Sequence, residues 1–115
     1  MNSRDTLKKN SDFHRLYARG KSAVSPYLVV YCRKNRGGVS RFGYTVSARL
    51  CHAVVRNRIR RRLREIVRLN RARLVPGYDV VIVARSKAVD CEYRRLEEAF
   101  LRACKKLGML TEGPA

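Results

Sequence analysis

The residues of this sequence best suited to chemistry are arginines that could bind phosphate groups. Seven arginines stand between Arg56 and Arg68, and Glu65 is the one acidic residue among them. A guanidinium presents its donors in one plane and can hold a phosphate with two hydrogen bonds, a geometry that lysine lacks. So many like charges on a free helix would repel one another. The segment therefore predicts a surface for an anionic partner, and its preference for arginine favours RNA.

Helical spacing separates this segment into a cationic side and an apolar side. We expect a helix over about residues 51–71, in which successive side chains are turned by about 100°. The residues that fall within about 40° of Asn57 are Arg61, Arg64 and Arg68. The apolar residues centre almost opposite and are Val55, Ile59, Leu63, Ile66 and Val67. One side is thus expected to pack and the other to bind RNA, with Arg62 at the boundary and outside the RNA contact.

A second group of residues could stack on unpaired bases. Phe13 and Tyr17 share one face of a short helix expected over about residues 10–18, and Tyr31 lies in a strand expected over residues 27–33. Aromatic side chains hold single-stranded RNA by stacking, with little reading of its sequence. From spacing alone, the alternative that these three residues belong to an ordinary core stays open.

The sequence offers no set of residues suited to catalysis by the protein itself. A nuclease that uses two metal ions needs several converging carboxylates. The nine acidic residues are scattered, and the adjacent pair Glu97 and Glu98 would point to different sides of a helix. His14 and His52 are the only histidines and would have to meet across two elements to act as acid and base. We therefore expect no catalytic residue in this chain.

Length and charge agree with a small RNA-binding domain. The 115 residues suit one domain, and 45% hydrophobic residues can form a core. A net charge of +18 and a pI near 10.9 are typical of proteins that bind nucleic acids. We expect a cytoplasmic protein, because no apolar run could cross a membrane and no secretory signal is present. The cysteines lack zinc-site spacing and are expected to be free thiols: Cys32, Cys51, Cys91 and Cys104.

Hydrophobic pattern and turn residues predict the element order α-β-β-α-β-α, with one further short extended piece. The remaining elements are the extended piece at 22–24, strands at 41–49 and 78–84, and a helix at 90–107. The Val-Val-Ile-Val run of the last strand predicts burial on both of its faces. The two glycines of the turn at 35–38 favour a hairpin between the strands at 27–33 and 41–49.

The stretch at residues 43–65 resembles the protein subunit of bacterial ribonuclease P. Its most specific part is the sequence Ala-Val-x-Arg-Asn-Arg at residues 53–58. Further similarity lies at residues 7–13, 29–31 and 77–85. The resemblance covers about residues 7–107 and is strongest in the arginine-rich segment.

The resemblance implies an α+β fold in a single domain spanning residues 1–115, with an ordered core at about 7–108 and a loose tail at 109–115. A sheet of about four strands would pack with three helices in the order α-β-β-β-α-β-α, and the piece at 22–24 would supply the extra strand. The resemblance also implies a left-handed βαβ crossover through the arginine-rich helix, whereas general statistics predict a right-handed one.

The resemblance further implies the protein subunit of a ribonucleoprotein endonuclease that removes the 5′ leader of precursor tRNA. The residues expected to bind the catalytic RNA subunit are Arg56, Asn57, Arg58, Arg60, Arg61 and Arg64, with Arg68 added by the helix spacing. Those expected to bind the leader, in a cleft between the first helix and the sheet, are Phe13, Tyr17, Tyr31 and Arg49. Arg49 is the remaining cation of its loop, because Ala48 stands where the family usually has Lys or Arg, and Cys51-His52 replace the usual Gly-Asn.

Catalysis would then reside in the RNA subunit, with Mg²⁺ held mainly by RNA. No protein partner is expected to be required, and no metal ligand of the protein is assigned. Two alternatives stay open. A structural ribosomal RNA-binding protein would share the size and charge, and a DNA-binding regulator would need a base-reading helix end and a dimer geometry that the sequence does not display.

Overall fold

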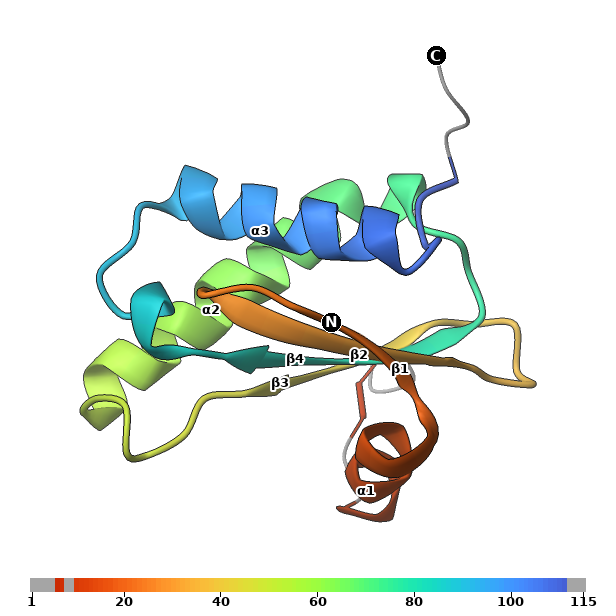
Figure 1. The fold of residues 1–115 in the computed structure, drawn as a ribbon, viewed down its shortest axis with the longest axis horizontal. Coiled ribbons are helices and arrows are strands. Elements are labelled where there is room, and N and C mark those ends of the chain that lie inside the picture. The colour runs from red at the N-terminus through yellow and green to blue at the C-terminus, as the bar shows by residue number, and fades with distance from the viewer. Residues whose placement is uncertain (1–5, 8–9, 112–115) are drawn as a thin grey trace.

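A four-stranded sheet forms the centre of the molecule, with helices on both of its faces (Figure 1). The structure is a computed structural model that describes residues 6–7 and 10–111. The helices are α1 (Asn10–Arg19), α2 (Ala53–Asn70) and α3 (Tyr93–Lys106), with short 3-10 helices η2 (Arg71–Arg73) and η3 (Ser86–Ala88). The strands are β1 (Lys21–Val24), β2 (Leu28–Lys34), β3 (Arg41–Thr45) and β4 (Tyr78–Ala84). The predicted α+β fold, with the order α-β-β-β-α-β-α, is confirmed.

The strand order within the sheet is β1-β2-β4-β3. β4 pairs antiparallel with β2 and parallel with β3, so α2 connects two neighbouring parallel strands. The predicted hairpin between β2 and β3 is therefore wrong, because β4 lies between them. The sequence of β4 explains this position: Val80, Val81 and Ile82 are fully buried, and a strand that is apolar on both faces is most stable inside a sheet.

Helices cover the two faces of the sheet unequally. α2 and α3 pack together over one face, where residues such as Leu63 and Phe100 fill the main core (Figure 1). α1 packs alone on the other face, over a smaller core of buried Leu7, Leu16 and Val81. Because one ten-residue helix does not cover a whole sheet face, side chains of the sheet stay partly exposed on both sides of α1.

Several elements begin or end at other residues than predicted. β3 ends at Thr45 and not near residue 49, because a turn at 48–50 precedes α2. α3 begins at Tyr93 and not near Asp90, since η3 and a turn occupy the preceding residues. It ends before Gly108, as predicted, where a φ of +73° favours glycine.

The chain continues to pack after α3. Met109 is 1% exposed in the main core, and Leu110 forms an isolated bridge with Leu74. The tail that was expected to be loose from residue 109 is thus held against the core through Thr111, whose N–H donates to the carbonyl of Arg73 at 2.8 Å. Residues 112–115 of that predicted tail lie outside the described residues.

Ion pairs fasten α1 and the start of β3 to β4. Arg41 donates from Nε and Nη2 to the two carboxylate oxygens of Asp79, at 2.9 and 2.7 Å. Asn35 Nδ2 donates to the same carboxylate at 2.9 Å, and Arg41 also lies 3.9 Å from Asp12 of α1. Burial disfavours the Asp79 anion, but the hydrogen bonds from Arg41 and Asn35 outweigh it and hold the pKa of Asp79 below its ordinary value.

We expect Asp79→Asn to lower the free energy of unfolding by about 1 to 2 kcal/mol at neutral pH, because it removes the charged partner of the partly exposed Arg41. Since folding depresses the pKa of Asp79, this stability is fully present above the unfolded pKa of about 3.9 and is lost as pH falls through the folded pKa. Urea denaturation of the wild type and of Asp79→Asn, at neutral pH and at about pH 2 to 3, measures the loss of unfolding free energy under both conditions. Asp90→Asn, at an exposed position, is the control, and an equally large effect of Asp79→Asn in acid would contradict the assignment.

Candidate nucleic-acid interface

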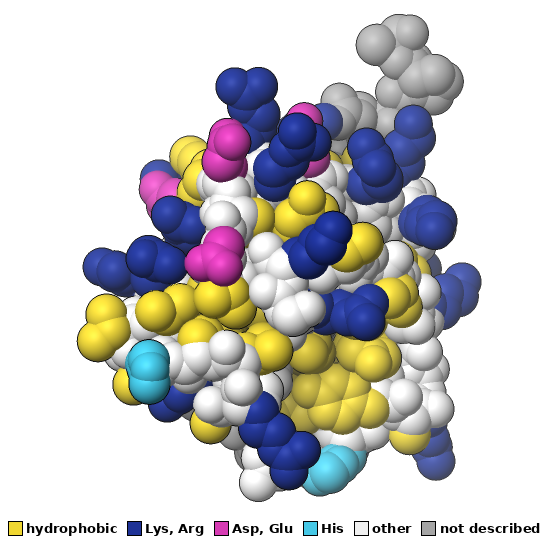
Figure 2. All heavy atoms as spheres, turned by 60° about the vertical axis from the view of Figure 1, so that its left-hand side comes forward, with side chains coloured by type: hydrophobic (Ala, Val, Ile, Leu, Met, Phe, Trp, Pro, Cys, Tyr) yellow, Lys and Arg dark blue, Asp and Glu magenta, His cyan; other side chains and the backbone are white. Residues whose placement is uncertain are grey.

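α2 presents the two sides that its sequence predicts. The predicted apolar residues Ile59, Leu63, Ile66 and Val67 are buried, and Val55 is half-buried. The predicted binding residues Asn57, Arg58, Arg61, Arg64 and Arg68 are exposed, whereas Arg56 and Arg60 are half-buried. On the face of the molecule drawn in Figure 2, Lys and Arg side chains outnumber Asp and Glu. The exposed side of α2 is therefore cationic, and its packing side is apolar.

Some arginines of α2 also hold the fold together. Three of them donate to backbone carbonyls of adjacent segments: Arg56 to Cys51 at 2.7 Å, Arg58 to Val89 at 3.4 Å and Arg62 to Cys91 at 3.2 Å. Arg62 thus lies at the boundary, as its helical angle predicts. The bonds of Arg56 and Arg58 tie α2 to the segments before it and after η3, a role that helical spacing did not indicate.

Two arginines of α2 keep their donors available. Arg68 forms a bidentate pair with Glu65, with both hydrogen bonds at 2.7 Å, and Arg60 donates to Asn57 Oδ1 at 3.1 Å. The side chain of Arg61 makes no hydrogen bond or ion pair within the described part of the chain. Arg64 likewise has no hydrogen-bond acceptor there, and its guanidinium carbon lies 6.0 Å from the ring centre of Tyr44. Arg61 and Arg64 are thus the best placed of the predicted residues to bind phosphate.

α1 brings the three predicted aromatic residues onto one part of the sheet face. The rings of Tyr17 and Tyr31 meet edge to face, with centroids 4.9 Å apart and planes at 73°. Phe13 and Tyr31 are half-buried against the smaller core, whereas Tyr17 is 41% exposed. The three rings thus support α1 and still offer ring surface to solvent. We call Phe13, Tyr17 and Tyr31 the aromatic patch.

Gly43 of β3 makes room for Phe13, a role that was not predicted from the sequence. A Cβ at this position would overlap Cε1 of Phe13 and lie 3.3 Å from Cβ of Leu7. The φ of Gly43 is not positive, so glycine is needed here for space and not for backbone conformation. A glycine within a strand does indicate close approach of another group, and this was the available signal.

The fourth residue predicted for this surface, Arg49, lies in the turn between β3 and α2. Its side chain is exposed, and its backbone N–H donates to Oγ of Ser47 at 3.2 Å. The turn fixes the backbone of Arg49 while leaving the guanidinium in solvent.

A hollow of about 420 Å³ joins the aromatic patch to the cationic side of α2. Phe13 lines it on one side and Arg60 and Arg64 on the other, with Gly43 and Tyr44 of β3 between them. The Tyr44 hydroxyl is buried without a hydrogen-bond partner in the described chain. Burial raises the pKa of Tyr44 to about 12 against the influence of nearby arginines, so this hydroxyl stays protonated. The two predicted surfaces are therefore neighbours across the edge strand β3.

The described residues do not form a site for a resident metal ion. No three His, Cys, Asp or Glu side chains among them gather closely enough to hold one. Two carboxylates on the α1 side of the sheet, Asp12 and Asp79, are both within ion-pair distance of Arg41. These residues therefore do not fit Mg²⁺.

None of the helices within residues 6–7 and 10–111 has the length and apolar character to cross a membrane.

Comparisons with known proteins identify the family to which this chain is similar. The ribonuclease P family model matches residues 1–108. A ribonuclease P protein component from Alkaliphilus oremlandii is 36% identical over 110 residues, which is 96% of each chain. The solved RNase P protein of Staphylococcus aureus superposes with a TM-score of 0.85 at 30% identity, covering 93% of this chain and 98% of its own. That of Thermotoga maritima gives a TM-score of 0.78 at 32% identity, covering 84% and 92%. With its fold, its sequence and its family model in agreement, the chain belongs to the ribonuclease P protein component family.

Proposed function

We propose that this chain is the RNA-binding protein subunit of a ribonucleoprotein that removes the 5′ leader from precursor tRNA. The observation that carries the proposal is the adjacency of two surfaces suited to RNA, the cationic side of α2 and the aromatic patch, across the hollow at β3. One surface suits a phosphate-rich folded RNA, and the other suits unpaired bases. A protein that must hold two RNAs together needs both.

The cationic side of α2 contacts the catalytic RNA in this proposal. Arg61 and Arg64 bind phosphates directly, and Arg68 binds one by exchanging its pair with Glu65 for a phosphate. The other assigned residues are Arg56, Asn57, Arg58 and Arg60. By neutralising phosphates, this side lowers the repulsion between the catalytic RNA and its substrate.

The aromatic patch holds the single-stranded leader. The exposed ring surface of Tyr17 and Tyr31 stacks on bases without reading their sequence, and Phe13 extends the apolar surface toward β3. Arg49, exposed in the turn after β3, binds a leader phosphate. Leader contacts of this kind favour precursor over mature tRNA, since the mature molecule has no leader.

The chemical step belongs to the RNA subunit. Because the described residues do not fit Mg²⁺, we assign the magnesium of the reaction to RNA and no catalytic residue to the protein. The protein acts in the bacterial cytoplasm, without a required protein partner, by raising the affinity of the ribonucleoprotein for its substrate.

Cleavage of a 5′-labelled precursor tRNA by a bacterial ribonuclease P RNA, at a Mg²⁺ concentration too low for the RNA alone, tests this function. We expect cleavage at the mature 5′ end only when the protein is added. A folded preparation that gives no stimulation with the cognate RNA would contradict the proposal. Stoichiometric sedimentation with ribosomal subunits in the same extracts would then favour the ribosomal alternative.

We expect Gly43→Ala to reduce the preference for precursor over mature tRNA by about 3- to 10-fold, because the new Cβ displaces Phe13. Equilibrium binding of both RNAs to the reconstituted ribonucleoprotein measures this preference. In a Phe13→Leu background, the same substitution should change it little, because the displaced ring is already absent. Additive effects in this double-mutant cycle would contradict the seating role of Gly43.

A further inference from the structure

α1 divides the sheet face beneath it into two sides. With Leu16 turned toward the sheet, the helical period places Phe13 and Tyr17 on one flank of α1. The same period places Asp12, Arg15 and Arg19 on the opposite flank. Leu16 is 2% exposed, so α1 closes onto the sheet and leaves no passage beneath it.

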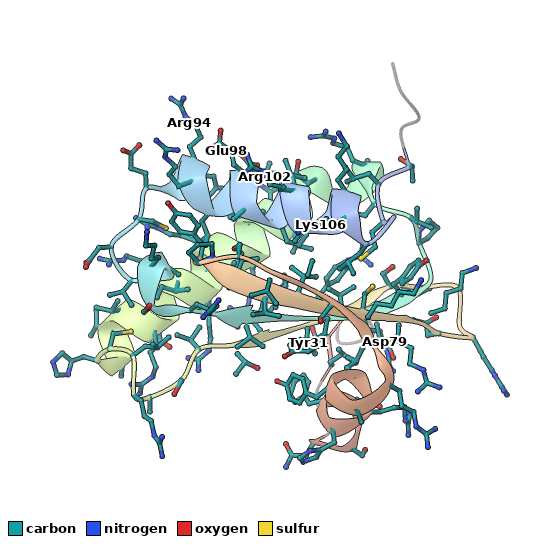
Figure 3. The ribbon with its side chains drawn as sticks, viewed as in Figure 1. Tyr31, Asp79, Arg94, Glu98, Arg102 and Lys106 are labelled. Carbon is teal, nitrogen blue, oxygen red and sulfur yellow. The ribbon has the colours of Figure 1, made fainter. Side chains whose placement is uncertain are left out.

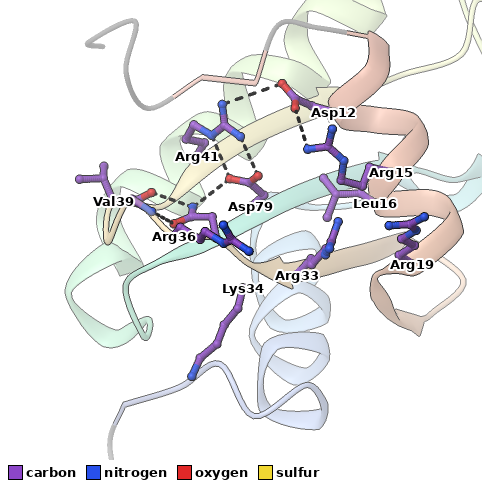
Figure 4. A pocket seen from close by; sticks show the side chains of 12 residues that line it. Asp12, Arg15, Leu16, Arg19, Arg33, Lys34, Arg36, Val39, Arg41 and Asp79 are labelled. Atoms are coloured by element: carbon purple, nitrogen blue, oxygen red, sulfur yellow. Dashed lines mark hydrogen bonds and ion pairs between the residues drawn. The ribbon is translucent and has the colours of Figure 1, made fainter.

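The second flank borders a hollow of about 710 Å³, which we call the arginine pocket (Figure 4). Its walls are α1, the end of β2, the β2–β3 turn and the start of β3. Its cationic lining residues are Arg15, Arg19, Arg33, Lys34, Arg36 and Arg41. Asp12 and Asp79 are the carboxylates that line it. None of these cations belongs to α2 or to the aromatic patch, so the proposed function makes no use of them.

The floor of the arginine pocket is fixed by hydrogen bonds. Asp79 accepts from Arg41 and Asn35, and Asp12 lies 3.8 Å from Arg15 and 3.9 Å from Arg41. Asn35 also orders the turn, because its Nδ2 donates to the carbonyl of Val39 at 2.9 Å and its Oδ1 accepts from the N–H of Gly37 at 3.1 Å. Asp12 is thus within ion-pair distance of Arg15 and Arg41, Asp79 is bound by Arg41 and Asn35, and the turn that carries Arg36 is held in place.

The rim of the arginine pocket carries cations without counter-charges. The side chains of Arg19, Arg33, Lys34 and Arg36 form no hydrogen bond or ion pair with any residue that the structure describes. Figure 4 shows Arg19, Arg33 and Arg36 around one opening, whereas Lys34 extends away from it. They come from three elements, so the tertiary fold and not a local charge run brings them together. Their mutual repulsion is relieved when an anion enters.

We propose that the arginine pocket binds phosphodiester groups of an RNA segment other than the one held by the aromatic patch. Three guanidinium groups around an opening suit phosphate oxygens, which arginine binds with paired hydrogen bonds. Because α1 stands between the two sides and is closed onto the sheet, a strand lying on the aromatic patch does not continue beneath the helix into the pocket. The identity of the ligand as RNA rests on the proposed function, whereas the phosphate chemistry rests on the pocket itself.

The variant Arg19→Gln/Arg36→Gln tests the arginine pocket, because both side chains are exposed and unpaired in the described chain and their loss should leave the fold intact. Arg94→Gln/Arg102→Gln removes the same charge from the outer side of α3, across the sheet from α1 (Figure 3). Affinity for the catalytic RNA is measured over a series of salt concentrations. We expect the pocket variant to bind about tenfold more weakly and its slope of log affinity against log salt to fall by about 1.4 to 1.8, as for two lost phosphate contacts. The α3 variant should keep both values.

Two further readouts separate the possible results. The preference of the ribonucleoprotein for precursor over mature tRNA should be unchanged in the pocket variant, and a reduced preference would mean that the pocket holds the leader, against the proposal. Equal losses of RNA affinity in the two variants would show that only net charge matters and would overturn the proposal.

Inorganic pyrophosphate added to the free protein should shift the amide resonances of Asn35 and Gly37 saturably, except in the pocket variant. If the wild-type chain shows these shifts but does not bind the catalytic RNA, the proposed function fails and the phosphate site stands. If the shifts are absent or equal in all three proteins, the site itself is disproved.

Discussion

Replacing Arg61 and Arg64 together by Ala is expected to weaken binding to the catalytic RNA by about 100-fold at physiological salt. These are the two arginines of α2 whose donors are not used by another described residue. Each should hold a phosphate with charge-assisted hydrogen bonds, and Arg64 also borders the hollow that leads to the aromatic patch. Filter binding or gel shift with the labelled RNA subunit measures the change.

The matched control is Arg94→Ala/Arg102→Ala, which removes two exposed arginines from α3. A similar loss of affinity in this control would show that total charge, and not the position of Arg61 and Arg64, determines binding. Arg58→Ala provides a second comparison, because its hydrogen bond to Val89 gives it a structural role. We expect that substitution to lower thermal stability as well as RNA affinity, whereas the Arg61 and Arg64 substitutions should leave stability unchanged.

Tyr31→Ala is expected to weaken binding of precursor tRNA to the ribonucleoprotein by about 5- to 100-fold and to leave mature tRNA almost unaffected. Removal of the ring eliminates its own stacking surface and the edge-to-face support of Tyr17, 4.9 Å away between centroids. Equilibrium binding of the two RNAs, measured in parallel, gives the ratio.

Tyr31→Phe is the control for this experiment, because it keeps the ring and should keep the preference for precursor over mature tRNA. Circular dichroism must first show that Tyr31→Ala is folded, since Tyr31 packs against the smaller core. If precursor and mature tRNA are weakened equally by a folded variant, the aromatic patch does not hold the leader.

The sequence predicted those features of the fold that depend on neighbouring residues. The helical period of α2 correctly separated buried Leu63 from exposed Arg61, and the apolar run of β4 correctly indicated burial on both faces. Strand pairing depends on residues that are distant in the sequence, and the residues of the turn after β2 predicted the wrong partner strand. The glycines after β2 favoured a hairpin, but the burial gained by placing β4 in the centre of the sheet determined the pairing.

Of the candidate site, too, the sequence predicted the features that depend on neighbouring residues and not those that depend on the tertiary fold. Helical spacing placed Phe13 and Tyr17 together, and their meeting with Tyr31 followed from packing of α1 on the sheet. Spacing could not distinguish Arg58, which donates to Val89, from Arg61, which has no such partner, because residue 89 is brought near only by the tertiary fold. For the same reason, the convergence of Arg19, Arg33 and Arg36 on one opening was not visible in the sequence.

The small contact area of α1 has a consequence for how the protein responds to its ligands. The smaller core that anchors this helix has three buried residues, whereas the opposite face of the sheet holds the main core. α1 should therefore open locally at a lower free energy than global unfolding, and its amides should exchange with solvent before those of β4. The same helix borders both the aromatic patch and the arginine pocket, so a ligand on either flank restricts its motion. Occupation of one flank then reduces the entropy cost of occupying the other, which makes the two binding events cooperative without any contact between the ligands.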